Sequence, residues 1–161
     1  MTLQISIITV SDRSSRGERP DASGPALAEL VRTQGWQVVK QEIVADELEA
    51  IKTKFQDWSD SGEIDVILAT GGTGFAPRDV TPEATRAVVD RLTPGLDEAM
   101  RAASLRVTPH AILSRAVSGI RKRTLIVNLP GSPKGATENL QVLLPALEHA
   151  VHLLRDEDAG H

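Results

Sequence analysis

The stretch that decides the fold is Val66-Ile67-Leu68-Ala69-Thr70-Gly71-Gly72-Thr73-Gly74, an apolar run that passes directly into a glycine-rich turn. A short apolar run bounded by turn residues predicts a strand covered on both faces, as in the middle of a parallel sheet. Three glycines in four residues allow a tight turn whose N–H groups face a phosphate without obstruction by Cβ atoms. We therefore expect a buried strand that ends in an anion-binding loop. The competing interpretation is a glycine-rich turn without a ligand.

The rest of the chain alternates short β-branched runs with amphipathic stretches. This alternation predicts an α/β protein of three layers, α/β/α, around a mostly parallel sheet. Ligands of such sheets bind beyond the carboxyl ends of the strands, so the loops that follow strands are the candidate sites. The expected strands are residues 5–10, 38–44, 66–69 and 125–129, with 116–121 as a further candidate, and the expected helices are residues 24–34, 48–58, 96–106, one that begins near 81, and one near the C-terminus.

Prolines and polar residues suggest how two of these helices are bounded. Thr81 is expected to be the N-cap of its helix, with Pro82 at the first helical position. Pro145 is expected to kink or restart the C-terminal helix. We expect residues 1–155 to form a single domain and residues 156–161 to form a frayed tail.

Composition excludes several classes of function. The chain has 161 residues, of which 40% are hydrophobic and 25% charged, as in ordinary globular proteins. A net charge of −4 and only four aromatic residues, two Trp and two Phe, argue against a nucleic-acid partner. The absence of cysteine excludes disulfides, thiolate metal sites and cysteine nucleophiles. No apolar run approaches the ~20 residues that span a bilayer, so we expect a cytoplasmic protein without a membrane partner.

Two further loops follow predicted strands. Ser11-Asp12-Arg13-Ser14-Ser15-Arg16-Gly17 offers hydroxyls, amides and two arginines to an anion, although a solvated surface turn is the competing interpretation. Asn128-Leu129-Pro130-Gly131-Ser132-Pro133-Lys134-Gly135 combines stiff prolines with glycines that allow close backbone approach. It also opens the C-terminal helix, whose positive dipole end favours an anion.

Two aspartates follow strands or precede helices at the same edge of the predicted sheet. Asp79 lies just before the helix near Thr81, and Asp46 ends the second strand. Because parallel strands open their loops on one rim, Asp46 and Asp79 could converge on one complex of metal and nucleotide. Mg²⁺ is commonly held by one or two carboxylates together with phosphate oxygens. On spacing alone, the competing interpretation is that Asp46 only caps the following helix.

Together these loops resemble the signature of the molybdopterin adenylyltransferases. The resemblance covers nearly the whole chain, and the Asp-Val-Thr-Pro element makes it more specific than the Gly-Gly-Thr-Gly element, which a wider superfamily shares. The residues that carry it are Thr70-Gly71-Gly72-Thr73-Gly74, Arg78-Asp79-Val80-Thr81-Pro82-Glu83-Ala84, Ala111-Ile112-Leu113-Ser114-Arg115 and Leu129-Pro130-Gly131.

The resemblance implies a Mg²⁺-dependent transfer of AMP from ATP to the terminal phosphate of molybdopterin, by a homotrimer. It implies that Asp46 and Asp79 hold the metal or orient substrate and that Ser114 joins them as a catalytic residue. The alternatives are a non-catalytic molybdopterin-binding protein of the same fold, a molybdate-inserting protein or nucleotide hydrolase, and a subunit whose main task is assembly within a larger complex. The implied binding residues are Ser11, Asp12, Thr70, Gly71, Gly72, Thr73, Gly74, Asn128, Pro130, Gly131 and Ser132.

Overall fold

The structure, a computed structural model, describes residues 1–156. Apart from Asp156, the tail expected at residues 156–161 therefore lies outside the described residues. The strands are β1 (Gln4–Val10), β2 (Gln37–Val44), β3 (Val66–Thr70), β4 (Arg91–Leu92), β5 (Ser118–Arg121) and β6 (Thr124–Leu129). The helices are α1 (Asp12–Ser15), α2 (Ser23–Thr33), α3 (Leu48–Asp60), α4 (Thr81–Val88), α5 (Pro94–Leu105) and α6 (Pro133–Leu154), with a 3-10 helix, η1 (Pro109–Leu113).

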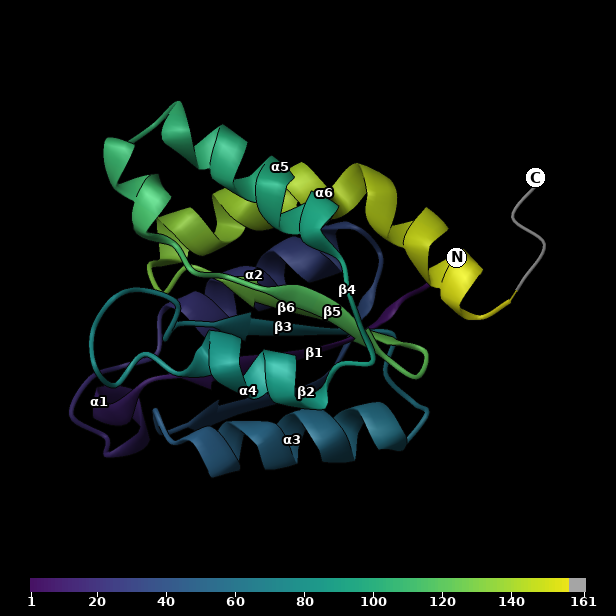
Figure 1. Cartoon of the computed structure of the whole chain (residues 1–161). Helices are drawn as coiled ribbons and strands as arrows, with labels where there is room; N and C mark the ends of the chain where they lie inside the picture. Colours follow the sequence, from purple (N-terminus) through teal and green to yellow (C-terminus); the bar gives the residue numbers. More distant parts are fainter. Residues whose placement is uncertain (157–161) are drawn as a thin grey trace.

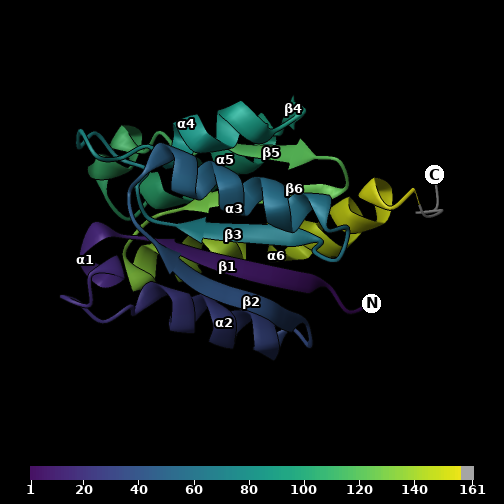
Figure 2. The same ribbon diagram turned by 90° about the horizontal axis from the view of Figure 1, so that it is seen from below.

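The strands form one six-stranded sheet in the order β2-β1-β3-β6-β5-β4 (Figure 2). β2, β1, β3 and β6 run parallel, β5 pairs antiparallel with β6, and β4 pairs antiparallel with β5. Every residue of β3 is buried, as its apolar sequence predicts for a strand covered on both faces. The expected mostly parallel sheet is confirmed.

Helices cover both faces of this sheet and make three layers (Figure 1). Because neighbouring strand residues point to opposite faces, Ile5 and Ile7 of β1 pack in one core and Ile8 and Val10 in another. The first core is closed by α2, α5 and α6, and the second by α3 and α4. The predicted α/β/α arrangement is therefore confirmed.

Some local predictions were wrong or incomplete. Val80, not Thr81, occupies the N-cap position of α4, and Thr81 is the first helical residue. α6 continues through Pro145 as one helical element and does not restart there. The sequence reading missed α1, β4 and η1, because elements of four, two and five residues are too short to show a periodic pattern. None of the described helices is both long and apolar enough to cross a membrane.

The sheet topology fixes where a ligand can bind. The chain passes from β1 to β2 on one side and returns to β3 on the other side of β1, so the strand order reverses between β1 and β3. The loops after these two strands diverge at that point and leave a crevice, which is the usual ligand position in open α/β sheets. These loops and α1 lie at the left edge of the molecule in Figure 1.

Candidate functional site

The turn after β3 requires glycine at two positions. Gly71 has φ +104° and Gly72 has φ +67°, both in the region that L side chains rarely adopt. A Cβ at Gly71 would collide with the carbonyl oxygen of Val10 at the end of β1, and a Cβ at Gly72 would collide with the hydroxyl of Thr81. The turn therefore packs closely against the end of β1 and against Thr81, with no room for a Cβ at either position.

Neighbouring segments hold this turn in place. The Thr81 hydroxyl donates to the Gly71 carbonyl at 2.8 Å, which explains why this threonine is buried and does not cap α4. The Gly71 N–H donates to the carbonyl of Leu129 at 3.1 Å, and the Thr70 hydroxyl donates to that of Pro130 at 2.6 Å. The glycine turn and the loop after β6 thus form one continuous wall.

Asp46 is held by the loop after β1. Its Oδ2 accepts the N–H of Asp12 at 2.8 Å, and its own N–H donates to Oδ1 of Asp12 at 3.0 Å. Glu47 occupies the N-cap position of α3, so the interpretation of Asp46 as the cap of that helix is wrong. The other oxygen, Oδ1, lies against Gly72 of the glycine turn. Asp46 therefore keeps one carboxylate oxygen available for a ligand.

Charges around Asp46 are unevenly balanced. Burial raises the pKa of Asp46, and repulsion from Asp12 and Asp79 raises it further. Arg78 pairs with Asp12 through two hydrogen bonds of 3.0 Å and also reaches Glu47 at 3.0 Å. The Arg78 guanidinium lowers the pKa of Asp12. Asp12 is thus neutralised by an arginine, whereas Asp46 and Asp79 face each other's charge.

Asp46 and Asp79 line the same cavity, which we call the acidic pocket. It has a volume of about 500 Å³ and opens at the carboxyl ends of β1 and β3. Arg13 and Arg19 also line it; Arg13 is one of the two arginines of the Ser11–Gly17 loop, whereas the sequence did not single out Arg19. Nine predicted site residues line it, namely Ser11, Asp12, Asp46, Thr70, Gly71, Gly72, Asp79, Gly131 and Ser132.

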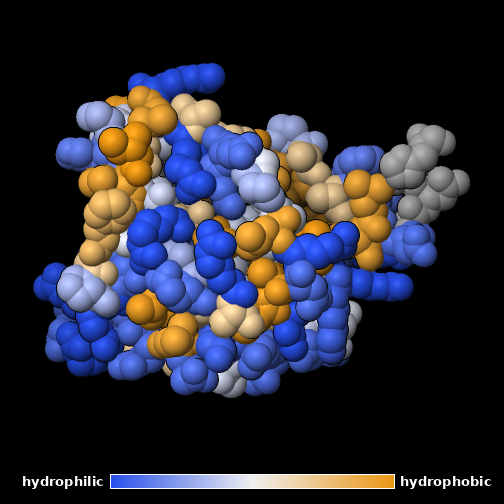
Figure 3. All heavy atoms as spheres, viewed as in Figure 1, coloured by the Kyte–Doolittle hydropathy of each residue, from blue (hydrophilic) through white to orange (hydrophobic). Residues whose placement is uncertain are grey.

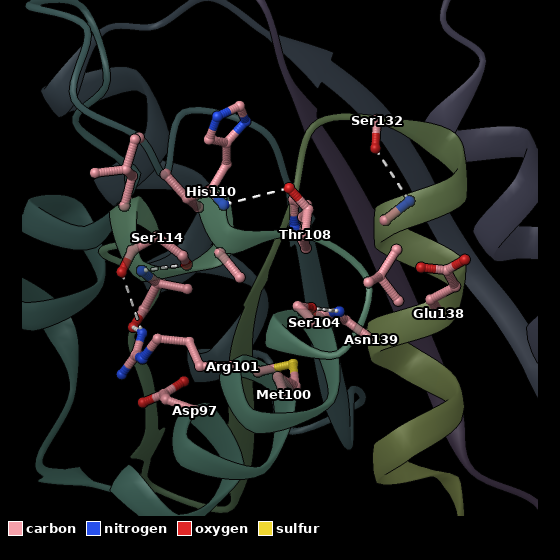
Figure 4. A pocket seen from close by; sticks show the side chains of 18 residues that line it. Asp97, Met100, Arg101, Ser104, Thr108, His110, Ser114, Ser132, Glu138 and Asn139 are labelled. Carbon is pink, nitrogen blue, oxygen red and sulfur yellow. Dashed lines mark hydrogen bonds between the residues drawn. The ribbon is translucent and has the colours of Figure 1, made fainter.

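A second cavity, the α5 pocket, adjoins the acidic pocket and has a volume of about 300 Å³ (Figure 4). Ser132 lines both cavities, so they share a wall. The predicted residues Thr73, Gly74, Ser114 and Pro130 line this second cavity. Sequence reasoning missed its α5 and α6 side, which is formed by Asp97, Met100, Arg101, Ser104, Glu138 and Asn139.

The missed α5 side chains share a recognisable spacing. Asp97, Arg101 and Ser104 recur at helical intervals together with Met100, on the face of α5 that turns toward the protein. Asp97 is buried and accepts the N–H and hydroxyl of Ser118 at 3.0 and 2.7 Å, while burial raises its pKa. Arg101 extends toward the Ser114 segment and donates to its carbonyls (Figure 4). The signal that could have identified this side of the cavity is the placement of the charged residues Asp97 and Arg101 on the inward face of an amphipathic helix.

Asn128 lies behind the site and lines neither cavity. Its side chain is fully buried. Its Oδ1 accepts the N–H of Val117 at 3.1 Å, and its Nδ2 donates to the Thr85 hydroxyl at 2.8 Å. The structure therefore places Asn128 where it fastens β6 to the neighbouring segments, and a direct contact with a ligand stays a prediction.

The fold and site define an α/β protein whose glycine turn, carboxylates and helix starts line a crevice at the strand-order reversal. Residues 6–149 match the family described as "Probable molybdopterin binding domain". The chain belongs to this family.

Individual relatives agree with this membership. The molybdopterin biosynthesis enzyme MoaB from Thermus thermophilus superposes with a TM-score of 0.91 at 50% identity, over 97% of this chain and 98% of that one. A molybdopterin adenylyltransferase of Helicobacter pylori (strain J99) is 42% identical over 95% of this chain and 88% of its own length. Gephyrin of Dictyostelium discoideum is also 42% identical over 95% of this chain, which spans only 23% of that protein.

Proposed function

We propose that this protein transfers AMP from ATP to the terminal phosphate of molybdopterin and releases pyrophosphate. The observation that carries the proposal is that Asp46 and Asp79 line one cavity with the Gly71–Gly72 turn. A relative that shares 42% identity over most of both chains is named molybdopterin adenylyltransferase, which supports the same reaction here. Two adjoining cavities suit a reaction that must bring two phosphate-bearing substrates together.

The acidic pocket fits Mg²⁺ bound together with a polyphosphate. Asp46 has one carboxylate oxygen available, and its negative charge is repelled by that of Asp79. A cation between the two carboxylates would relieve this repulsion. Among residues 1–156 no cluster of three or more acidic or histidine side chains could enclose a metal by itself. Mg²⁺ usually completes its oxygen ligands with water and substrate phosphate, which matches this incomplete donor set.

The proposed reaction needs no protein nucleophile. An oxygen of the pterin phosphate attacks the α-phosphorus of ATP, a new P–O bond forms, and the bond to the oxygen bridging the α- and β-phosphates breaks. The N–H groups around Gly72 bind phosphate oxygens, the positive dipole end of α6 adds a favourable field, and Asp46 and Asp79 would hold the cation. When bound, Mg²⁺ would neutralise the negative charge of the reacting phosphates. The task of the chain is to align two anions against their mutual repulsion.

Transfer of label tests the proposal. The protein is incubated with molybdopterin, Mg²⁺ and ATP labelled at the α-phosphate, and labelled pterin and pyrophosphate are quantified. We expect the wild type to transfer label, Asp79→Asn to lose at least ~10²-fold in rate, and Asp57→Asn, an exposed α3 position, to behave as wild type. A wild-type protein that binds molybdopterin without releasing pyrophosphate would instead be a non-catalytic binding protein.

We also propose a homotrimer that works in the cytoplasm. The family resemblance suggests the trimer, and exposed apolar side chains give it a surface to bury. Figure 3 shows apolar residues gathered where α5 ends and η1 follows. Light scattering of the purified protein measures the number of chains directly. The exposed residues of this region are Leu105, Val107, Ile112 and Leu113.

A further inference from the structure

Arg115 connects segments that line both cavities. It follows Ser114 directly, and its N–H donates to the carbonyl of Thr73 at 2.8 Å. Its guanidinium Nε donates to the carbonyl of Gly74 at 2.8 Å, and Nη2 donates to that of Asp79 at 2.8 Å. One residue therefore joins the glycine turn, the Asp79 segment and the Ser114 segment.

An ion pair fixes the direction of the Arg115 guanidinium. Nη1 and Nη2 donate to the two carboxylate oxygens of Glu83 at 2.9 and 3.0 Å. The Glu83 carboxylate raises the pKa of Arg115, and Arg115 lowers the pKa of Glu83 in return. Glu83 belongs to the first turn of α4, where the helix dipole also favours a negative charge. A guanidinium held by this carboxylate can serve Gly74 and Asp79 at the same time.

The planar fork of arginine is what this position needs. The Gly74 and Asp79 carbonyls and the Glu83 carboxylate lie in different directions around the guanidinium, and all three receive N–H groups. A lysine carries the same charge on one nitrogen and cannot reach these acceptors in one plane. The contacts are to backbone and to Glu83, and Arg115 lines neither cavity. Its effect on a bound substrate must therefore pass through the segments that it holds.

We propose that Arg115 is a positioning residue of the transfer reaction. It sets the Asp79 segment of the acidic pocket against Gly74 and Ser114 of the α5 pocket, so that the two substrates meet in one geometry. This inference rests on the proposed adenylyl transfer. Because Arg115 acts on alignment, its loss lowers kcat and changes the KM values for ATP and molybdopterin little. A misplacement of reacting groups by about 1 Å costs on the order of 10²-fold in rate.

The chain offers a matched control for the ion pair. Arg121 forms the same kind of two-pronged pair, with Asp60 at 2.9 and 3.0 Å, and donates to the carbonyl of Val88 at 2.9 Å. It lies at the end of β5 that leads into the β5–β6 turn, and it lines neither cavity. Losing Arg115 removes one ion pair and two hydrogen bonds to carbonyls, and losing Arg121 removes one ion pair and one such bond. Only Arg115 bonds to the site segments.

The test combines label-transfer kinetics with thermal unfolding for the wild type and for Arg115→Gln, Arg115→Lys, Glu83→Gln, Arg121→Gln and Arg121→Lys. We expect Arg115→Gln to lower kcat about 10²-fold and Arg115→Lys at least ~10-fold, with KM values within about threefold. Glu83→Gln should lie between Arg115→Lys and the wild type. Both Arg121 variants should lower Tm as much as the Arg115 variants do and keep kcat within about twofold.

The outcomes separate this inference from the proposed function. A wild-type protein that transfers no label overturns the proposed function, and the inference falls with it. A wild-type rate retained by Arg115→Gln overturns the inference alone. It is also overturned if Arg121→Gln reduces kcat as strongly as Arg115→Gln at an equal loss of Tm, because the effect would then be general destabilisation.

Discussion

Replacing Gly71 by alanine tests whether the glycine turn is shaped by its contact with β1. At φ +104° an L side chain is strained, which costs about 1–2 kcal/mol. The added Cβ would also meet the carbonyl oxygen of Val10, in a strand that cannot move without disturbing the sheet. Overpacking of this kind costs a further ~1–3 kcal/mol. The expected loss in the free energy of unfolding is therefore about 2–5 kcal/mol.

Gly35→Ala provides the matched control. Gly35 has φ +79°, and a Cβ added there would meet nothing within 4 Å. It should therefore show the conformational cost alone, about 1–2 kcal/mol. Urea unfolding of both variants gives the difference, which at an m-value of ~2 kcal/mol/M corresponds to a shift of about 0.5–1.5 M between their midpoints. Label transfer should be lost in Gly71→Ala and retained in Gly35→Ala.

Unfolding of the two variants at the same urea concentration would contradict this expectation. The steric contact with Val10 would then contribute nothing, and the turn would not be fixed by β1. A stable Gly71→Ala protein with full label transfer would also contradict the role of the turn as a phosphate-binding loop.

Three further perturbations address single residues of the site. Asp46→Asn should abolish transfer yet stabilise the protein. Because the folded-state pKa of Asp46 is raised, the wild type loses stability as pH rises through that pKa. Urea unfolding from pH 4 to pH 7 should therefore show that the stability advantage of the variant grows with pH. Asn128→Ala should cost about 2–4 kcal/mol in urea unfolding, because it leaves the buried Val117 N–H without its acceptor. Unchanged stability would contradict this structural role of Asn128. Arg19→Gln should raise the KM for ATP several-fold, since Arg19 lines the acidic pocket. Arg16 pairs with Glu18 instead, so Arg16→Gln should leave the KM for ATP unchanged. Equal KM values for both variants would show that Arg19 does not belong to the site.

The sequence was sufficient for the five longer strands and for the candidate loops that follow them, but not for the two-residue β4. An all-apolar β3 and three closely spaced glycines indicate a buried strand and an open turn by local chemistry alone. Parallel strands place the loops that follow them on one rim, which is why the sequence alone could group Asp46 with the glycine turn. The buried strand is confirmed, and Asp46 lines one cavity with the glycine turn; the binding role of that turn stays a prediction.

The sequence could not predict the hydrogen bonds of side chains whose partners are distant in the chain. Thr81 looks like a helix cap, yet its hydroxyl bonds to Gly71, ten residues earlier, because the turn folds back over the start of α4. Asp46 and Asp12 bond reciprocally across 34 residues. Arg115 reaches Gly74 across 41 residues, and no spacing pattern marks such a contact. Side-chain partners of this kind are decided by tertiary packing, which leaves no local pattern in the sequence.

In the proposed reaction the side chains of Asp46 and Asp79 act on the same divalent cation. The direct measurement is a double-mutant cycle on kcat/KM for label transfer, with Asp46→Asn, Asp79→Asn and the double variant. If both carboxylates hold one cation, the loss in the double variant should be close to the larger of the two single losses. If the single losses instead multiply in the double variant, the two aspartates act independently, which would contradict a shared cation.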